Sequence, residues 1–264
     1  MAEISGINWT DASFAPWLGC ARISTACDRC YAAAIDKRAG RDLWAPHAER
    51  QHTSRDYWRQ PHRWQAEAAR TGTTRRVFAS HLSDIFDNRA PDAWRVEFWQ
   101  LVRETPDLTW MVLTKRPSLI LRMLPSWWGD GPANVWLGCT VEDMAEARRR
   151  IPLLLATPAP IHWLSCEPML ERLDLRPWLD RLHWVVCGGE SGPGARKMSP
   201  AWARALRDQC SDADVAFWMK QTGSARAQWP GAVGHGDQLQ HLPADLRIRQ
   251  LPRIGPDDRQ ATGI

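Results

Sequence analysis

The sequence lacks the motifs that identify the commonest nucleotide-binding and hydrolytic enzymes. Its 264 residues contain no P-loop, no G-x-G-x-x-G stretch and no G-x-S-x-G nucleophile elbow. The usual motif-based grounds for assigning a P-loop NTPase, a dinucleotide-dependent oxidoreductase or an α/β-hydrolase are therefore missing.

Long apolar runs and a secretory leader are also missing. No apolar run approaches the roughly 18 residues that a membrane-spanning helix needs. The residues after Met1 show neither a basic segment nor an apolar one, as a signal peptide would. We therefore expect a cytoplasmic protein with no membrane partner. The seven cysteines, an odd number, then favour free thiols or metal binding over disulfides.

The composition is that of a globular protein with a mild basic excess. Hydrophobic residues make up 44% and charged residues 24%, and the net charge is +4. This charge is compatible with a nucleic-acid partner but does not require one. Tyrosine and phenylalanine are scarce, at 2 and 5, beside 17 tryptophans, most of which we expect in the core or at its rim.

Seven short apolar runs, several followed by amphipathic helical segments, predict parallel strands buried on both faces. The runs are Ile7–Thr10, Val77–Ser80, Trp110–Thr114, Val135–Thr140, Ile161–Ser165, His183–Cys187 and Val215–Met219. The clearest helical segments are 92–104, 141–155 and 200–210. This alternation predicts an α/β fold in one domain, a partial (β/α) barrel of six or seven strands resembling a TIM barrel. We place the barrel at residues 1–224 and an irregular tail at 225–264.

Ionisable residues follow the apolar runs closely. They are Asp84, Lys115, Glu142, Glu167, Glu190 and Lys220. In a parallel barrel the carboxyl ends of the strands meet at one face, which carries the active site. A simpler interpretation makes these positions helix caps, with Thr140, Ser165 and Ser191 as N-cap residues. Six successive ionisable positions favour a functional face.

Other polar and sulfur-containing residues carry weaker signals. The segment Gly188–Gly192 could bring backbone amides close to an anion, or could simply make a turn. His81 ends a strand and is as well explained by a structural as by a catalytic role. Cys139, Cys166 and Cys187 lie in or just after strands, so we expect buried thiols there, and Cys210 is expected on a core-facing helix side.

Three cysteines near the N-terminus form the sharpest motif. Cys20, Cys27 and Cys30 have the spacing C-x6-C-x2-C. Three thiolates can hold three corners of an iron–sulfur cluster and leave one iron open. A zinc site would need a fourth ligand, for which His47 and His52 are the nearest histidines. Purely structural thiols are the third alternative.

Several segments resemble a phage-associated family of uncharacterised proteins with a three-cysteine motif, itself similar to divergent radical S-adenosylmethionine (SAM) enzymes. They are Asn8–Asp11, Gly19–Ala32, Leu113–Pro117, Asn134–Gly138, Leu164–Pro168 and Gly188–Arg196. Two features depart from the common radical SAM pattern. The first cysteine gap has six residues instead of three, and Ser80–Asp84 stands where a Gly-Gly-Glu motif is usual.

The resemblance implies an iron–sulfur enzyme that cleaves SAM reductively to start radical chemistry. It implies a [4Fe–4S] cluster on Cys20, Cys27 and Cys30, SAM as second cofactor, and a flavodoxin- or ferredoxin-like reductant. From strand-end position we expect catalytic roles for Lys115, Glu167 and Lys220. We expect cofactor contacts from Ser80, Asp84, Thr114, Glu142, Gly188, Gly189 and Glu190.

The resemblance and the basic charge favour DNA or RNA as substrate, in repair or modification. The alternative from another class is a zinc-stabilised nucleic-acid-binding protein without catalysis.

Overall fold

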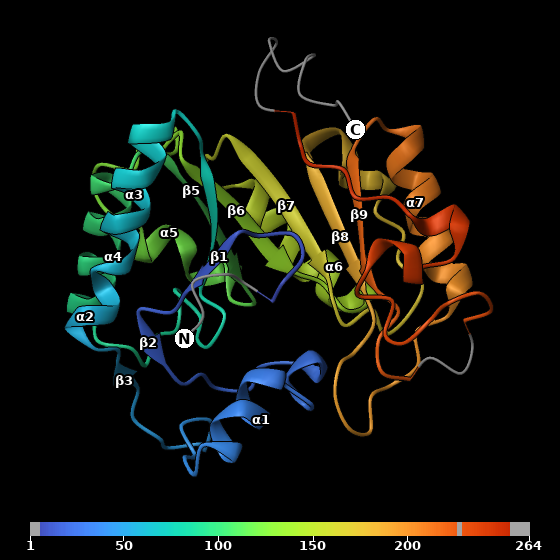
Figure 1. Ribbon diagram of the computed structural model, residues 1–264, viewed down its shortest axis with the longest axis horizontal. Coiled ribbons are helices and arrows are strands. Elements are labelled where there is room, and N and C mark those ends of the chain that lie inside the picture. The colour runs from blue at the N-terminus through green and yellow to red at the C-terminus, as the bar shows by residue number, and fades with distance from the viewer. Residues whose placement is uncertain (1–5, 226–228, 254–264) are drawn as a thin grey trace.

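Seven parallel strands form one curled sheet in the computed structural model, which describes residues 6–225 and 229–253 (Figure 1). The strands follow the order β1–β4–β5–β6–β7–β8–β9. Their bounds are β1 Ala12–Phe14, β4 Arg75–Ala79, β5 Leu108–Thr114, β6 Val135–Thr140, β7 Ile161–Cys166, β8 Trp184–Gly188 and β9 Ala216–Gln221. The expected fold class is confirmed as an α/β half-barrel with edge strands β1 and β9.

Six of the seven predicted strands are confirmed, and the first is wrong. The first strand of the sheet is Ala12–Phe14, not residues 7–10. Residues 7–10 form a turn in which the Thr10 amide donates to the Ile7 carbonyl at 3.2 Å. Trp9 is buried there although it is not in a strand. Its burial produced an apolar signal without extended structure.

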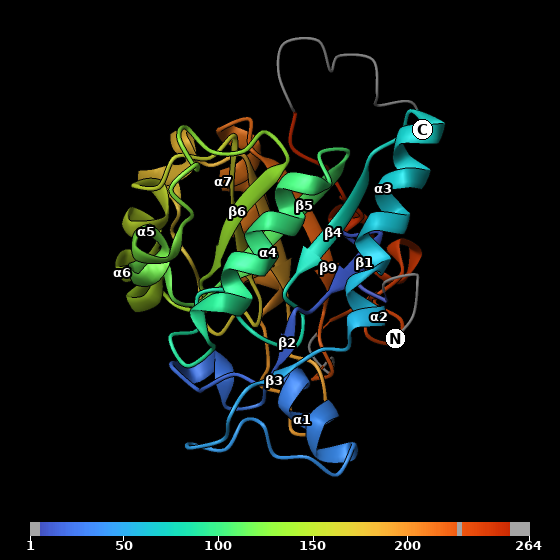
Figure 2. The same ribbon diagram turned by 90° about the vertical axis from the view of Figure 1, so that its left-hand side faces the viewer.

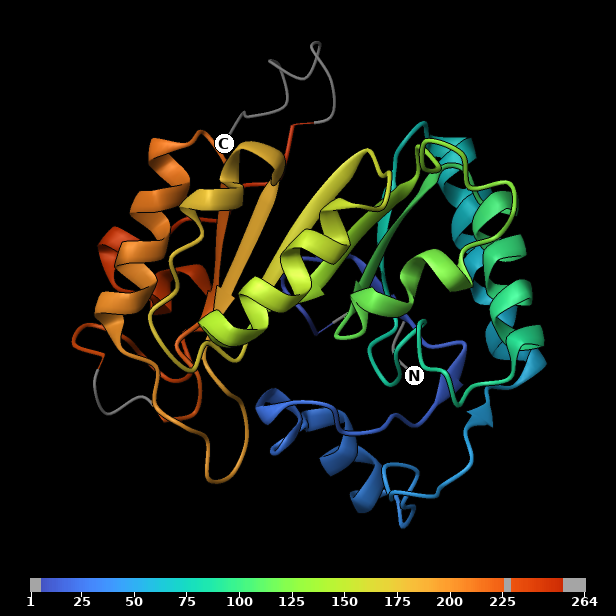
Figure 3. The same ribbon diagram turned by 180° about the vertical axis from the view of Figure 1, so that it is seen from behind.

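The helices cover the outer face of the sheet. Helices α3 (Gln60–Thr71) and α4 (Asp92–Glu104) lie over the early strands (Figure 2), and α5 (Ile120–Met123), α6 (Met144–Leu155) and α7 (Pro200–Asp212) over the later ones (Figure 3). The three predicted helices are confirmed as α4, α6 and α7. Helix α6 begins later than expected because the Asp143 carboxylate accepts a hydrogen bond from the Glu146 amide at 2.8 Å, an N-cap interaction.

The concave face of the sheet has its own aromatic core. Its buried residues are Trp9, Phe78, Met111, Trp136, Ile161, Trp163, Trp184, Val186 and Trp218. Neighbouring rings lie close, with centroids 5.2 Å apart for Trp163 and Trp184. Gly138 is required here, because a Cβ atom at this position would lie 2.5 Å from the Trp163 ring. Most tryptophans are buried, as expected from the sequence.

A small antiparallel pair holds the cysteine segment at both of its ends. Strand β2 (Trp17–Leu18) pairs with β3 (Gln51–His52), and residues 19–50 leave the barrel between them. This excursion contains the three cysteines and helix α1 (Tyr31–Arg38). Figure 1 shows α1 beyond the carboxyl ends of the strands, and β3 then leads into α2 (Arg55–Trp58).

The described part of the chain after β9 packs against the barrel. Leu242 and Leu246 belong to the core between sheet and helices, and Arg249 forms an isolated antiparallel bridge with Trp218. The division between residues 1–224 and 225–264 stays a prediction, and residues 226–228 and 254–264 lie outside the described residues. In the part of the chain described, no helix has the length and apolar character to cross a bilayer.

Candidate functional site

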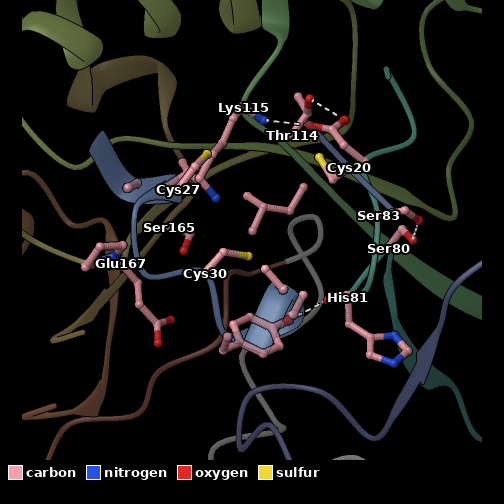
Figure 4. Close-up of a pocket in the computed structure, with 18 of the residues that line it drawn as sticks. Cys20, Cys27, Cys30, Ser80, His81, Ser83, Thr114, Lys115, Ser165 and Glu167 are labelled. Carbon is pink, nitrogen blue, oxygen red and sulfur yellow. Dashed lines mark hydrogen bonds between the residues drawn. The ribbon is translucent and has the colours of Figure 1, made fainter. Parts of the chain in front are cut away.

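A cavity of about 330 Å³ opens at the carboxyl ends of the strands (Figure 4). All but two of the residues predicted for the site line it. These are Cys20, Cys27, Cys30, Ser80, Asp84, Thr114, Lys115, Glu167, Gly189, Glu190 and Lys220. Glu142 and Gly188 are the two that do not. The parallel sheet therefore collects residues from distant parts of the chain at one mouth.

The three cysteines border this cavity from different positions on the loop after β2. Figure 4 shows Cys20, Cys27 and Cys30 around one space, with Lys115 directed toward the region of Cys27. As whole residues, all three cysteines have intermediate exposure. Separate contacts to the barrel hold different parts of this loop.

Arg116, which follows β5, holds the Cys20 end of the loop. Its Nη1 donates to Cys20 Sγ at 3.4 Å and to Asp84 Oδ2 at 3.0 Å, and its Nη2 donates to the Ala21 carbonyl at 2.8 Å. Burial raises the pKa of the Cys20 thiol to about 11, although the Arg116 charge opposes this. Arg116 was not among the residues predicted from the sequence.

Asp84 organises the backbone around Arg116. Its Oδ1 accepts from Thr114 Oγ1 at 2.8 Å, and its Oδ2 accepts from the Lys115 amide at 3.1 Å in addition to Arg116. The side chain is nearly buried, so the ion pair with Arg116 compensates its charge. Asp84 therefore faces the cavity with both oxygens already in use.

Glu142 supports the middle of the loop from outside the cavity wall. Its Oε1 accepts from the Ala26 amide at 3.4 Å, and its Oε2 is 2.7 Å from Arg150 Nη1. The Glu142 and Arg150 side chains are both 0% exposed. A cofactor contact from Glu142 stays a prediction, and its observed contacts are to the protein.

A third attachment joins the cysteine loop to the loop after β8. Glu190 pairs with Arg29 at 3.3 Å and with Arg196, which also donates to the Thr25 carbonyl at 2.9 Å. Burial favours the neutral form of Glu190, but the hydrogen bonds from Arg196 and Arg29 outweigh it, so its pKa lies below the usual range. Glu190 is therefore held ionised between two arginines.

Glu167 and Lys220 form an ion pair on the cavity wall. Lys220 Nζ lies 2.5 Å from Glu167 Oε1, which also accepts from Gln221 Nε2 at 3.1 Å. Both charged side chains remain partly exposed. Gly188 lies beside this pair, and a Cβ atom there would lie 3.2 Å from the Glu167 carboxyl carbon. Gly188 thus makes room for Glu167.

The loop after β4 supplies two hydroxyls and a neutral imidazole. The Ser80 and Ser83 hydroxyls hydrogen-bond to each other, and the Tyr31 hydroxyl donates to the His81 carbonyl at 2.7 Å. Burial lowers the pKa of His81 to about 4. His81 is therefore uncharged at neutral pH.

Thr140 and Ser165 also line the cavity, although we expected them only as possible helix caps. That interpretation is wrong for Thr140, because Asp143 caps α6 and the Thr140 hydroxyl is buried without a partner. A signal for both positions exists in the sequence. Counting in steps of two from Trp136 and Trp163 places Thr140 and Ser165 on the same concave face.

The other cysteines lie away from solvent, as expected. Cys139, Cys166, Cys187 and Cys210 are buried free thiols. The histidines considered as zinc ligands do not line the cavity. His52 stacks on Trp58 with ring centroids 5.0 Å apart and contacts Glu97.

We tested the implied cluster against the arrangement of the thiols. Within residues 6–225 and 229–253, no three His, Cys, Asp or Glu side chains converge on a single metal ion. A cluster makes a different demand, because its cysteines bind different irons and surround a larger body. Three thiols spaced around one cavity fit this demand.

Comparison with known proteins gives a family and a distant structural likeness. The model of DUF5131, described as a protein of unknown function, matches residues 4–249. No curated protein matches the sequence.

Three structures of spore photoproduct lyase are similar at 11% identity. A mutant with bound AdoMet and dinucleoside spore photoproduct has a TM-score of 0.43 over 75% of this chain, and a mutant with the dinucleoside alone has 0.45 over 74%. A complex with dinucleoside spore photoproduct has a TM-score of 0.41 over 73%. The matched region spans only 58–60% of the length of those chains.

Proposed function

The chain belongs to the DUF5131 family, and we propose that it is a radical SAM-like iron–sulfur enzyme. In this proposal Cys20, Cys27 and Cys30 hold a [4Fe–4S] cluster through their thiolates. The observation that carries the proposal is the meeting of these three thiols with the Glu167–Lys220 pair and Lys115 in one cavity.

When bound, the cluster would supply the electron for reductive cleavage of SAM, which starts radical chemistry. The residues of this chain position the ligands and limit water around them. Arg116, Glu142 and Arg196 hold the cysteine loop over the strand ends. The loop and the aromatic residues Trp9 and Phe78, which also line the cavity, cover the reacting space.

The polar wall would contact SAM and substrate. We assign catalytic or substrate contacts to Lys115, Glu167 and Lys220, whose charged groups border the cavity. The remaining candidates for cofactor contacts are Ser80, Asp84, Thr114, Glu142, Gly188, Gly189 and Glu190. Asp84, Glu142 and Glu190 would act mainly by holding the loop, since their carboxylates already bind protein donors.

The proposal extends to two partners. A flavodoxin- or ferredoxin-like protein would supply the electron. The substrate class we favour is DNA or RNA, in repair or modification, because the chain carries a net charge of +4. Phosphate contacts of this kind predict binding that weakens as salt is raised.

The test is purification without oxygen, reconstitution with iron and sulfide, and absorbance near 400 nm with iron and zinc analysis. We expect a brown protein with about four irons per chain. Replacing Cys20, Cys27 and Cys30 by alanine should abolish the colour, while Cys210→Ala, which removes a buried thiol elsewhere, should retain it.

A colourless protein that holds one zinc would overturn the proposal in favour of a zinc-stabilised binding protein. If the cluster forms, the next measurement is release of 5′-deoxyadenosine from SAM under reducing conditions. A cluster-loaded protein that never cleaves SAM would leave an iron–sulfur protein but not a radical SAM enzyme.

A further inference from the structure

Three neighbouring strands end in donor groups that no described residue uses. The strands are β5, β6 and β7, and the residues are Lys115, Thr140 and Ser165. Thr140 and Ser165 are direct partners in the β6–β7 register. Thr114 pairs with Cys139 in the β5–β6 register, so Lys115 and Thr140 follow as the next residues. The three side chains therefore form one row across the sheet.

Alternation along each strand puts this row on the concave face. Trp136 and Trp163, four and two residues before Thr140 and Ser165, belong to the concave aromatic core. Met111, four residues before Lys115, belongs to the same core. Side chains two or four residues apart in a strand share a face. The row is thus the polar upper layer of a face whose lower layer is aromatic.

The donors in this row lack partners within the described chain. The Thr140 hydroxyl is buried with no hydrogen bond, in a residue that is 1% exposed. Neither the Lys115 ammonium nor the Ser165 hydroxyl has a protein partner among the described residues. Most buried polar groups are hydrogen-bonded, and one left unpaired costs on the order of 1–3 kcal/mol. Such a cost is retained where a ligand supplies the missing partner.

The nearby carboxylates do not neutralise Lys115. Glu167 is bound by Lys220 and Gln221, and Asp84 is bound by Arg116 and Thr114. Glu142 is bound by Arg150 and is buried outside the cavity. The row therefore keeps one uncompensated positive charge beside two hydroxyls.

We propose that Lys115, Thr140 and Ser165 form an anion niche that takes a carboxylate or phosphate oxygen pair of a ligand in the cavity. The ammonium supplies charge, and the two hydroxyls supply directed donors on one side. The identity of the ligand rests on the proposed function, which offers the carboxylate of SAM or a phosphodiester of a nucleic acid. The niche itself does not require the cluster.

The experiment compares ligands that differ by one charge. Calorimetry would measure binding of SAM against decarboxylated SAM, and of a deoxydinucleotide against its uncharged methylphosphonate form. Each pair is measured before and after iron–sulfide reconstitution. We expect wild-type protein to prefer the charged member of one pair about tenfold or more, as for hydrogen bonds to a charged group.

Variants connect that preference to the niche. Lys115→Met should reduce the affinity ratio of charged to uncharged ligand to near one, and Thr140→Val should reduce it less. Lys115→Arg should restore part of the preference that Lys115→Met removes. Lys197→Met, which removes an exposed lysine from another loop, should keep it. The pair that responds identifies carboxylate or phosphate as the anion.

Two results would overturn the niche. One is a wild-type protein with no charge preference in either pair, and the other is a preference that survives Lys115→Met. A protein that takes up no iron but shows the preference keeps the niche and refutes the proposed enzyme. A protein that holds a cluster without the preference refutes the niche alone.

Discussion

Two groups of polar residues occupy the same end of the barrel and differ in how fully they are paired. Asp84, Glu142 and Glu190 each bind an arginine and at least one backbone amide. Lys115, Thr140 and Ser165 have no side-chain partner among the described residues. Position at a strand end is common to both groups and does not separate them.

The difference indicates a division between support and ligand contact. The paired carboxylates hold the cysteine loop, so their charges are already balanced by the protein. The unpaired donors lie on the concave row, and the buried Thr140 hydroxyl among them lowers stability in the free protein because its desolvation is not compensated. Residues kept at such a cost are typical of functional sites, and the following substitutions test the division.

The largest effect is expected from the buried pair behind the loop. Arg150→Met leaves Glu142 buried without its counter-charge, and breaking a buried pair costs about 3–5 kcal/mol. Urea denaturation would measure the loss in free energy of unfolding. Arg149→Met is the matched control, because its partly exposed pair with Glu146 should contribute less than about 1 kcal/mol. Equal losses of stability in the two variants would show that the buried Glu142–Arg150 pair contributes no more to stability than an exposed pair.

Two threonine substitutions are expected to change the free energy of unfolding in opposite directions. Thr114→Val removes a hydroxyl that donates to Asp84 and accepts from the Arg116 amide, and should destabilise the protein by about 1–3 kcal/mol. Thr140→Val removes a buried hydroxyl without a partner and should stabilise it by about 1 kcal/mol. Thermal unfolding of both variants beside wild type measures the contrast. Destabilisation by Thr140→Val would mean that its hydroxyl already has a use in the free protein.

Lowering the pH should reduce the stability that the paired carboxylates contribute, because protonation removes their charge. The pKa of Glu190 is below its usual range in the folded chain, so the unfolded chain binds more protons as pH falls below about 4.5. The stability that ionised Glu190 contributes is present above that pH and is lost as pH falls through its lowered pKa. Glu190→Gln should flatten this part of a stability–pH curve. An unchanged slope would show that the arginines do not lower the pKa of Glu190 in the folded protein.

The smallest effect on stability is expected at the partly exposed attachment. Arg196→Gln should change global stability by about 1 kcal/mol or less, because Arg196 is partly exposed and the buried Glu190 carboxylate keeps its second arginine, Arg29. It should still release the Thr25 carbonyl and increase amide exchange across residues 20–30, measured by hydrogen–deuterium exchange. Arg204→Gln, which breaks an exposed pair with Asp245, is the control and should leave that exchange unchanged.

Much of the fold was predictable because buried parallel strands have a simple signature. The six runs from 77 to 219 are apolar on both faces and match β4 to β9. The first strand was predicted too early in the chain because Trp9 is buried although it lies in a turn. At this position a hydrophobic residue does not indicate an extended strand. Because the strands end at one face, most of the residues predicted for the site do line one cavity.

The pairing within the site was not predictable. Arg116 reaches Cys20 across 96 positions of sequence, and Glu142 reaches Ala26 across 116. Spacing marks which residues share an end of the barrel, but long-range contacts decide which charges are balanced. A period-two count from Trp136 and Trp163 places Thr140 and Ser165 on the concave face, but their positions shortly before Glu142 and Glu167 fit helix N-caps equally well.

The tryptophan layer beneath the cavity gives the site an optical reporter. Trp9 lines the cavity, and its ring lies 5.3 Å from Trp163 and 6.0 Å from Trp184. At such separations excitation can pass among the indoles, so a quencher near one ring dims the others. An iron–sulfur cluster in the cavity would therefore lower the intrinsic fluorescence of the whole layer. Emission could follow cluster loading in the unlabelled protein in real time.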